Sequence, residues 1–368
     1  MAKVRLGDIA TVVTKGTTPT TMGFQFEDGG INFVKIESIS EDGNFLKEKF
    51  SHISDECNVQ MRRSQLQEND ILFSIAGAIG RSAIVTKEIL PANTNQALAI
   101  IRVPKGKIDY NYLLYALSSS AINQQATQHQ QGVAQLNISL KNVSDFLLPI
   151  YTEAMQKRIV HNLKKIDKLI FLRKQQLAKL DELVKVRFVE MFGDPIRNDK
   201  HFVQKTGKSL FCFSSGKFLQ EEKRFQHGFP VYGGNGITWY TDIPLVKKPT
   251  IIIGRVGAYC GNVRMVNVPV WITDNAIYIK EFKTRELNLH FLLMLMKYMK
   301  FSNYADYSGQ PKITQKPLET LIYIVPPLEL QNRFAAFVER VDQQKQAVQQ
   351  SLEKLELMKK ALMQEYFG

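Results

Sequence analysis

Hydrophobic residues recur at alternating intervals of three and four positions in two stretches of the chain, residues 151–193 and 326–368. This heptad spacing is typical of a helix that packs along a partner helix. At a rise of about 1.5 Å per residue, each stretch predicts a helix about 60 Å long. The seam residues are Ile159, Leu163, Ile166, Ile170, Leu177, Leu180, Val184 and Met191 in the first stretch and Phe334, Val338, Val341, Val348, Leu352, Leu355, Leu362 and Tyr366 in the second.

The two seams lie in one chain, 175 positions apart. A single heptad seam would favour a dimerising coiled coil, but the second stretch supplies a partner within the chain, so we expect an internal antiparallel pair. Cations interrupt the seams at Arg173, Arg187, Lys345 and Lys359. Because like charges at a seam are unfavourable, we expect the helices to avoid a register that sets the two arginines against the two lysines.

Short apolar or alternating runs fill the rest of the chain and predict two strand-rich domains, residues 1–150 and 194–325. In the second, Gly233-Gly234-Asn235-Gly236 is typical of a hairpin turn. In the first, we expect strands near residues 9–13, 31–36, 70–75 and 97–103, a helix over residues 110–118 and a glutamine-rich loop over residues 124–131.

Landmark residues of the first domain return in the same order in the second, which indicates an internal duplication. The sequence therefore predicts an α/β (α+β) fold that is internally duplicated, in which residues 151–193 and 326–368 form two long antiparallel coiled-coil helices. The repeated landmarks are Gly7 and Gly16 with Gly207 and Gly216, residues 71–77 with 251–257, residues 94–97 with 273–276, Leu113-Leu114 with Leu292-Leu293, and Gly132 and Pro149 with Gly309 and Pro326.

The net charge of +13 indicates an acidic partner such as nucleic acid. The charge is uneven: residues 1–150 are neutral, whereas residues 194–325 carry 18 Lys and Arg against 10 Asp and Glu. No apolar run is long enough for a membrane span, and the N-terminus lacks the apolar region of a secretory signal. The three cysteines form no CxxC pair, so we expect reduced thiols in a cytoplasmic protein.

Two alternative functions follow from the sequence. Asp274, Glu281 and Lys283 imitate the D…ExK metal site of a Mg²⁺-dependent endonuclease. The first domain has no matching carboxylate pair, so a solvated strand end is favoured, and the histidine spacing supports no catalytic metal site. The second alternative is a coiled-coil scaffold protein that does not bind DNA.

Side chains suited to DNA contact are more numerous. Arg and Lys can bind guanine, Asn and Gln can bind adenine, and Lys and Thr can bind phosphates. Gln135 and Lys312 occupy equivalent places just after a loop glycine. The candidate DNA-binding residues are Lys15, Thr17, Arg62, Arg63, Arg81, Asn95, Gln96 and Gln135 in the first domain and Lys217, Tyr232, Asn235, Arg255, Asn275 and Lys312 in the second.

The chain resembles the DNA-sequence-specificity subunit of Type I restriction–modification systems over its whole length. The start of the first long helix departs from the usual Pro-Pro-Leu and reads Pro149-Ile150-Tyr151. The motifs that carry the resemblance are Leu148-Pro149 with Gln156-Lys157-Arg158-Ile159, Val325-Pro326-Pro327-Leu328-Glu329 with Gln331-Asn332-Arg333-Phe334, residues 70–77, residues 230–237, Gly132 with Gln135, and Ser308-Gly309-Gln310-Pro311-Lys312-Ile313.

The resemblance implies two target-recognition domains with pseudo-twofold symmetry, separated by the two long helices as a spacer. Each domain would read one half of a bipartite site in double-stranded DNA. Because the two domains have diverged, we expect an asymmetric site. The resemblance also implies two adenine-N6 methyltransferase subunits as partners, which carry S-adenosylmethionine, and in some systems restriction subunits that use ATP and Mg²⁺. This chain would then bind no cofactor itself and would select the substrate without catalysing its methylation.

Overall fold

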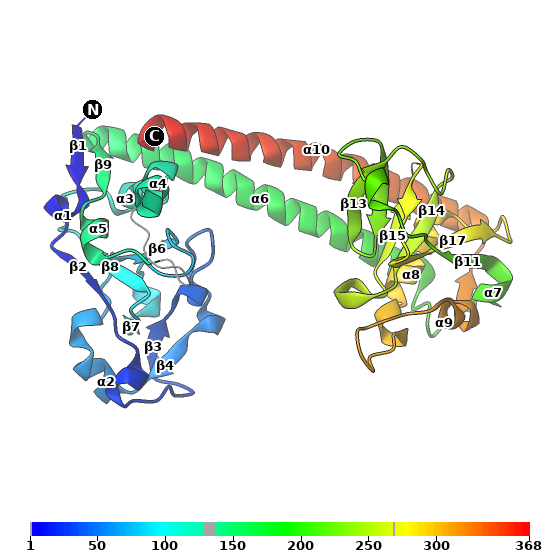
Figure 1. Ribbon diagram of the computed structural model, residues 1–368, viewed down its shortest axis with the longest axis horizontal. Helices are drawn as coiled ribbons and strands as arrows, with labels where there is room; N and C mark the ends of the chain where they lie inside the picture. Colours follow the sequence, from blue (N-terminus) through cyan, green and yellow to red (C-terminus); the bar gives the residue numbers. More distant parts are fainter. Residues whose placement is uncertain (1, 129–136, 268) are drawn as a thin grey trace. The chain divides into compact units, whose positions relative to one another are not determined.

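The computed structural model describes residues 2–128, 137–267 and 269–368 and divides into two compact units (Figure 1). Unit 1 consists of Met1–Leu172 and Ser351–Gly368, and unit 2 of Arg173–Gln350. Each long helix therefore contributes residues to both units. We keep the names domain 1 and domain 2 for residues 1–150 and 194–325, and this four-part division of the chain stays a prediction.

The two predicted long helices are α6 (Glu153–Phe192) and α10 (Leu328–Phe367). In unit 1, Lys359 Nζ lies 2.7 Å from Asp167 Oδ1, while Asn162 bonds the hydroxyl of Tyr366. Residue numbers thus rise along α6 as they fall along α10, and the antiparallel pairing is confirmed (Figure 1).

The same pairing pattern continues in unit 2, where Lys345 forms an ion pair with Asp181 of α6. Arg187 bonds Glu190 on its own helix at 2.8 Å. Both seam lysines therefore meet aspartates, and the register that opposes arginines and lysines does not occur. These aspartates were not found from the sequence, although they lie one position after seam residues and repeat 14 positions apart, like the two lysines.

The described residues of domain 1 form three sheets. The outer strands β1 and β9 pair antiparallel, a four-stranded antiparallel sheet has the order β2-β8-β5-β6, and a three-stranded sheet has the order β4-β3-β7 with β3 and β7 parallel. The strands are β1 Ala2–Arg5, β2 Val12–Lys15, β3 Ile31–Val34, β4 Ser51–Ile53, β5 Ile71–Ser74, β6 Ser82–Ile84, β7 Ala92–Thr94, β8 Leu98–Arg102 and β9 Leu147–Ile150, and the helices are α1 Leu6–Ile9, α2 Asp55–Gln60, α3 Tyr110–Leu117, α4 Ser120–Gln128 and α5 Leu140–Ser144.

Domain 2 repeats this arrangement strand for strand. Strands β10 and β18 pair antiparallel, and the two further sheets have the orders β11-β17-β14-β15 and β13-β12-β16, again with one parallel pair, β12 with β16. The predicted duplication is confirmed. The strands are β10 Val203–Thr206, β11 Phe211–Ser215, β12 Phe229–Gly233, β13 Gly236–Thr241, β14 Thr250–Gly254, β15 Val263–Val266, β16 Trp271–Ile272, β17 Ala276–Phe282 and β18 Ile322–Val325, and the helices are α7 Gly207–Leu210, α8 Leu289–Tyr298 and α9 Gln315–Thr320.

The repeated glycines have a physical reason. A Cβ atom on Gly16 would lie 1.7 Å from the carbonyl oxygen of Thr94, and one on Gly216 would lie 2.1 Å from that of Thr273. Real Cβ atoms do not approach so closely, so only glycine lets the end of β2 or β11 pass the neighbouring chain. The two threonines are the matching landmarks found in the sequence.

Three details of the sequence interpretation are wrong. Residues 9–13 are not one strand, because Ile9 ends α1 and β2 begins at Val12. The prediction of a glutamine-rich loop over residues 124–131 is wrong up to residue 128. Ile122 and Ala126 are buried at helical spacing, and α4 continues to Gln128. Residues 129–131 lie outside the described part of the chain.

The third error concerns the match of residues 94–97 with 273–276. Ser74 pairs with Leu98 and Gly254 with Ala276, so strands β8 and β17 correspond at a shift of 178 positions and not 179. One extra residue therefore lies in domain 1 between Thr94 and β8.

Each unit has its own main core, to which the long helices contribute. In unit 1, Ile159 and Leu163 of α6 pack with Tyr112 and Phe73. None of the helices within the described residues is long and apolar enough to cross a membrane. The three cysteines are free thiols.

In unit 2, the end of α6 packs into the domain through two aromatic side chains. Phe188 and Phe192 are fully buried, and their ring centroids lie 5.5 and 5.6 Å from that of Phe334 of α10. The sequence interpretation had placed Met191 in the seam here, although Met191 is only half-buried.

Candidate nucleic-acid interface

In domain 2 the loops that carry the candidate residues converge beside one hairpin turn. The turn Gly233–Gly236 joins β12 and β13, as predicted. A Cβ atom on Gly234 would lie 3.3 Å from the carbonyl oxygen of Asn275. The same carbonyl accepts a hydrogen bond from the backbone N–H of Arg255 at 2.9 Å. The turn, the end of β14 and the start of β17 therefore form one surface.

Two further loops join this surface. The carbonyl of Arg255 accepts from Ile313, and Val256 forms an isolated bridge with Lys312. The backbone N–H of Lys217 donates to Ile272 at 2.8 Å, which brings the end of β11 alongside β16. The structure thus brings together the domain 2 candidates, which are Lys217, Tyr232, Asn235, Arg255, Asn275 and Lys312.

These candidates are not equally available to a ligand. Asn235, Asn275, Lys217 and Lys312 are exposed, whereas Tyr232 is half-buried and packs against a small apolar core. Arg255 Nη1 donates to the backbone carbonyl beside it, that of residue 274, at 3.2 Å. Amide and ammonium groups therefore dominate the accessible chemistry of this surface, and they suit both base edges and phosphates.

In domain 1 the structure brings a smaller group together. The N–H of Gly16 donates to the carbonyl of Asn95 at 3.1 Å, and Thr18 Oγ1 donates to Gln96 Oε1 at 2.5 Å. Lys15 and Thr17 flank Gly16, so these four candidates share the end of the β2–β8 pair. This place is the counterpart of Gly216 and β17 in domain 2.

The remaining domain 1 candidates lie elsewhere. Arg81 Nη1 donates to the carbonyls of Ile39 and Ile36, at 2.9 and 3.3 Å, so its guanidinium holds a loop. Arg62 and Arg63 are exposed on the short helical turn after α2, which lies near β2. Gln135 lies outside the described residues.

Two buried glutamines at the start of the long helices were missed as structural residues. Gln156 accepts from the N–H of Asp109, the N-cap of α3, and donates to the carbonyl of Tyr151. Gln331 accepts from the N–H of Asn288, the N-cap of α8, and also makes two donor bonds of 2.8 Å. Their 175-residue spacing matches that of the seams and could have identified them.

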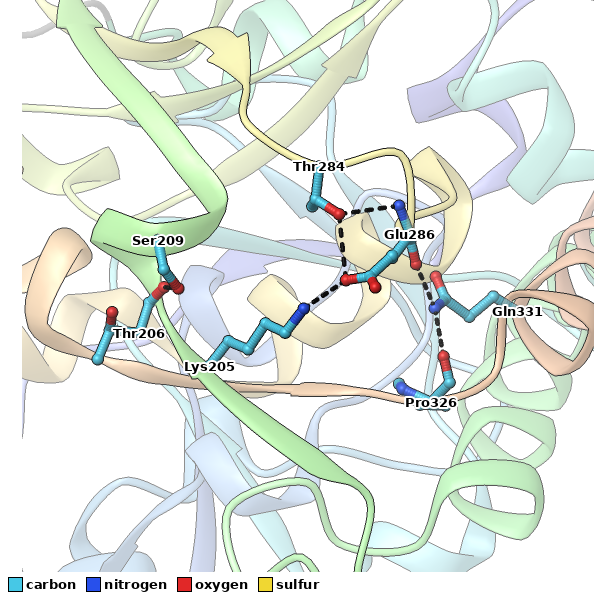
Figure 2. A network of polar contacts seen from close by, with 7 residues as sticks. All are labelled: Lys205, Thr206, Ser209, Thr284, Glu286, Pro326 and Gln331. Atoms are coloured by element: carbon cyan, nitrogen blue, oxygen red, sulfur yellow. Dashed lines mark hydrogen bonds and ion pairs between the residues drawn. The ribbon is translucent and has the colours of Figure 1, made fainter.

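Figure 2 shows the environment of Gln331. Its Nε2 donates to the carbonyls of Glu286 and Pro326. The carboxylate of Glu286 meets Lys205 Nζ of β10 at 2.5 Å and accepts from Thr284, and these two contacts lower its pKa. The network ties β10 and the segment after β17 to the start of α10, so it fixes the domain on its helix.

The geometry does not support the endonuclease alternative. Asp274 precedes β17, and Glu281 lies near the far end of that strand. At about 3.3 Å per residue, the strand separates them by more than about 15 Å, too far to ligate one metal ion. Lys283 Nζ instead donates to the carbonyl of Lys208. Among the described residues, no group of three or more His, Cys, Asp or Glu side chains could hold a metal ion.

The chain matches one protein family over most of its length. The family described as "Type I restriction modification DNA specificity domain" matches residues 1–182 and 202–357. The chain is 24% identical over 347 residues to the Type I restriction enzyme EcoprrI specificity subunit of Escherichia coli, covering 89% of this chain and 84% of that protein. It is 24% identical over 300 residues to a putative Type I specificity subunit of Mycoplasma pneumoniae, covering 77% and 76%.

Solved structures share the fold. A Type I restriction–modification S subunit from M. genitalium superimposes with a TM-score of 0.61 at 19% identity, covering 100% of this chain and 96% of that one. A second structure, described as showing complex assembly and conformational transition of the Type I system, has a TM-score of 0.62 at 17% identity, with 100% and 97% covered.

Proposed function

Because the chain belongs to the family of Type I restriction–modification DNA specificity domains, we propose that it reads a bipartite, asymmetric sequence in double-stranded DNA, one half with each domain. DNA sequence recognition within a restriction–modification complex is the role of this family, and its members are the specificity component and not the catalyst. The bipartite, asymmetric target is the finer part of the proposal.

The observation that carries it is the repetition of one framework with different side chains at the same place. Beside Gly16, domain 1 presents Lys15, Thr17 and the amides Asn95 and Gln96, whereas beside Gly216, domain 2 presents Ser215, Lys217 and Asn275. Amide pairs suit adenine, and cationic groups suit guanine or phosphate. Because the two domains share one backbone framework but present different side chains at the same place, we expect them to bind two different half-sites.

For the partners, we propose two adenine-N6 methyltransferase subunits that bring S-adenosylmethionine and dock on the long helices. Within unit 2, α6 exposes Leu183, Val186 and Val189, each more than 40% accessible. Three positions apart, they lie on one face, and such a row of exposed apolar side chains is typical of a protein-binding surface. In systems with a restriction subunit, that partner would bring ATP and Mg²⁺.

The test is co-purification of the chain with a co-encoded adenine methyltransferase, followed by mapping of methylated adenines in host DNA. We expect a split motif. Exchange of residues 194–325 for those of a relative should change one half of the motif, and exchange of residues 1–150 should change the other half. Methylation that is absent, or that neither exchange alters, would overturn the proposal and favour the scaffold alternative.

The docking surface has a separate test. Val186→Glu places a charge in the exposed apolar row and should weaken co-purification with the methyltransferase at least tenfold. Lys185→Glu, at the exposed neighbouring position, is the matched control and should change it little. Equal effects of both variants would count against this surface.

A further inference from the structure

Three cations from different elements lie near one another in unit 2, and only one of them forms an ion pair within the described residues. They are Arg264 in β15, Lys297 in α8 and Lys345 in α10. Lys345 is neutralised by an ion pair with Asp181 and lies 3.7 Å from Asp342. Within the described residues, Arg264 and Lys297 form no ion pair. Strand β15 is the edge strand of its sheet, with Arg264 on one face and α8, which carries Lys297, packed on the other, so the two charges flank one sheet edge.

Arg264 lies against the hairpin turn described above. Its Nη2 donates a long hydrogen bond, 3.4 Å, to Asn235 Oδ1, and a Cβ atom on Gly236 would lie 3.9 Å from its guanidinium carbon. Its Nε is buried, and among the described residues it has no hydrogen-bond partner. A half-buried guanidinium with an unused donor and one weak bond is incompletely satisfied.

Thr273 Oγ1 is also buried without a hydrogen-bond partner in the described part of the chain. It lies on the other side of the same turn, 3.8 Å from the position of a Cβ on Gly233. Both unsatisfied side-chain groups therefore flank one turn, where the polar contacts made by the described residues are incomplete.

Lys297 remains accessible to solvent and makes no hydrogen bond or ion pair within the described residues. Partial desolvation lowers its pKa, and the nearby charge of Lys345 lowers it further, as Arg264 does more weakly. Asp181 and Asp342 oppose this effect without cancelling it. A cation under these conditions is stabilised by an added anion.

Domain 1 lacks the cation that corresponds to Arg264. In β14, Ile252 pairs with Arg264 on one side and Tyr278 on the other. The corresponding strand β5 sets Leu72 between Ala83 and Ile100. Ala83 thus takes the place of Arg264, and it is fully buried.

The other two cations are also missing from domain 1. The N-caps of α3 and α8, 179 positions apart, make Ser118 the counterpart of Lys297. Ser118 is already satisfied, because its hydroxyl donates to the carbonyl of Leu114 at 2.8 Å. Along the long helices, the 175-position shift makes Ile170 the counterpart of Lys345. The three cations lie in unit 2, and their counterparts in unit 1 are uncharged.

We propose that Arg264 and Lys297 bind backbone phosphates of a DNA duplex that passes the β15 edge of the sheet, with Arg264 beside the β12–β13 turn. The inference rests on the proposed DNA-binding function and assigns it two residues. A phosphodiester carries one negative charge, and its oxygens accept charge-assisted hydrogen bonds from guanidinium and ammonium groups. Such contacts position a protein on DNA without reading its sequence. They would hold the turn, with Asn235 at its tip, against the base edges.

The test measures binding of the full chain with its methyltransferase partner to two duplexes, one carrying the mapped target and one unrelated. The variants are Arg264→Gln, which keeps the length of the side chain, and Lys297→Ser, which installs the residue of domain 1. Lys316→Ser removes an exposed cation of α9 and is the matched control. Thermal unfolding is recorded for each variant.

For Arg264→Gln and Lys297→Ser, we expect the slope of log affinity against log salt concentration to fall by about 0.9 for each phosphate that the variant no longer neutralises. The loss of affinity should be equal on both duplexes. Lys297→Arg, which keeps the charge, should restore the slope, and Lys316→Ser should leave it unchanged.

Three results would overturn the inference: unchanged slopes in both variants, an equal change in the control, or a loss confined to the target duplex, which would indicate base reading. A wild-type complex that does not prefer its mapped target would overturn the proposed function instead. The two failures are therefore distinguishable.

Discussion

At the start of β5, Asp70 and Arg102 form a buried ion pair in domain 1, whereas Thr250 and Lys280 occupy the corresponding positions of domain 2. Arg102 donates two hydrogen bonds of 2.6 Å to the Asp70 carboxylate, which is fully buried. In domain 2 the hydroxyl of Thr250 donates to the carbonyl of Ile279 at 2.6 Å, and Lys280 is exposed. At the same place in the framework, domain 1 therefore has an ion pair and domain 2 has a hydrogen bond between neutral groups.

In and beside β15, it is domain 2 that has charged side chains and domain 1 that has neutral ones. Domain 2 has Arg264 and Lys297 where domain 1 has Ala83 and Ser118. The duplicated framework therefore fixes the backbone and leaves the chemistry of each position free. This freedom is what a pair of domains needs in order to read two different half-sites.

The largest effect is expected where the two domains differ most. Asp70→Ala should lower the free energy of unfolding by about 3–5 kcal/mol, because it leaves the partly buried guanidinium of Arg102 without its partner. Thr250→Val should cost only about 1 kcal/mol, the value of one neutral hydrogen bond. Urea unfolding of each variant measures both.

Replacing both residues of the ion pair with their domain 2 counterparts tests whether the pair acts as a unit. The double variant Asp70→Thr and Arg102→Lys imitates domain 2, and it should be less destabilised than the sum of its single variants. If the losses of unfolding free energy in the two single variants add up to that of the double variant, the two side chains are not energetically coupled. Equal losses for Asp70→Ala and Thr250→Val would contradict the assigned difference.

Two equivalent glycines should respond differently to alanine. A Cβ atom on Gly207 would lie 2.2 Å from the carbonyl oxygen of Leu318, whereas one on Gly7 would lie 3.2 Å from its nearest neighbours, in Ser144. Gly207→Ala should therefore destabilise by about 1–3 kcal/mol. Gly7→Ala should cost less than about 1 kcal/mol, because a small shift relieves its contact and alanine favours the helix. Similar denaturation midpoints for the two variants would refute this interpretation.

The buried glutamines should differ by about one hydrogen bond. Gln331→Leu removes three bonds and Gln156→Leu two, and each leaves an N-cap N–H unpaired. We expect losses of about 1–3 kcal/mol, with Gln331→Leu about 1 kcal/mol the larger. Gln344→Leu, on the exposed surface of α10, is the control. A smaller loss at Gln331 would show that the Glu286 network adds no stability.

The smallest effect concerns pH. The pKa of Lys297 lies below the ordinary value of 10.5, owing to desolvation, Lys345 and Arg264, against the opposing charges of Asp181 and Asp342. If phosphate binding favours the charged form, DNA affinity should fall as pH rises through the lowered pKa, by less than about tenfold per pH unit because one proton is linked.

Lys297→Ser should show a smaller fall over the same pH interval, and Lys316→Ser should retain that of the wild type. Affinity measured at constant ionic strength over the alkaline pH range checks this. Identical profiles for Lys297→Ser and the wild type would remove Lys297 from the DNA surface.

Patterns that repeat along the chain were readable without a structure. The seam beginning at Ile159 and its repeat beginning at Phe334 indicated two paired helices, because heptad spacing places these residues on one face. The duplication followed from Gly16 and Gly216, since a backbone contact that only glycine tolerates leaves the same mark in both copies. The hairpin turn at Asn235 was equally local.

Contacts between residues far apart in the chain were not readable. Asp167 and Asp181 could be assigned to Lys359 and Lys345 only once the register of the helices was known. Phe192 appeared as the end of a helix and not as part of a domain core.

The sequence by itself determined the two long helices, the duplication and the hairpin turn, because hydrophobic period and glycine placement act within a few residues. Only the tertiary structure decided which polar groups remain unsatisfied. Arg264 is an ordinary arginine of a short strand until Asn235, 29 positions away, accepts the one hydrogen bond that its side chain makes within the described residues. The balance of charge at a site depends on all the charged groups that lie near it in space. Here these groups belong to β15, α8 and α10, which only the fold brings together.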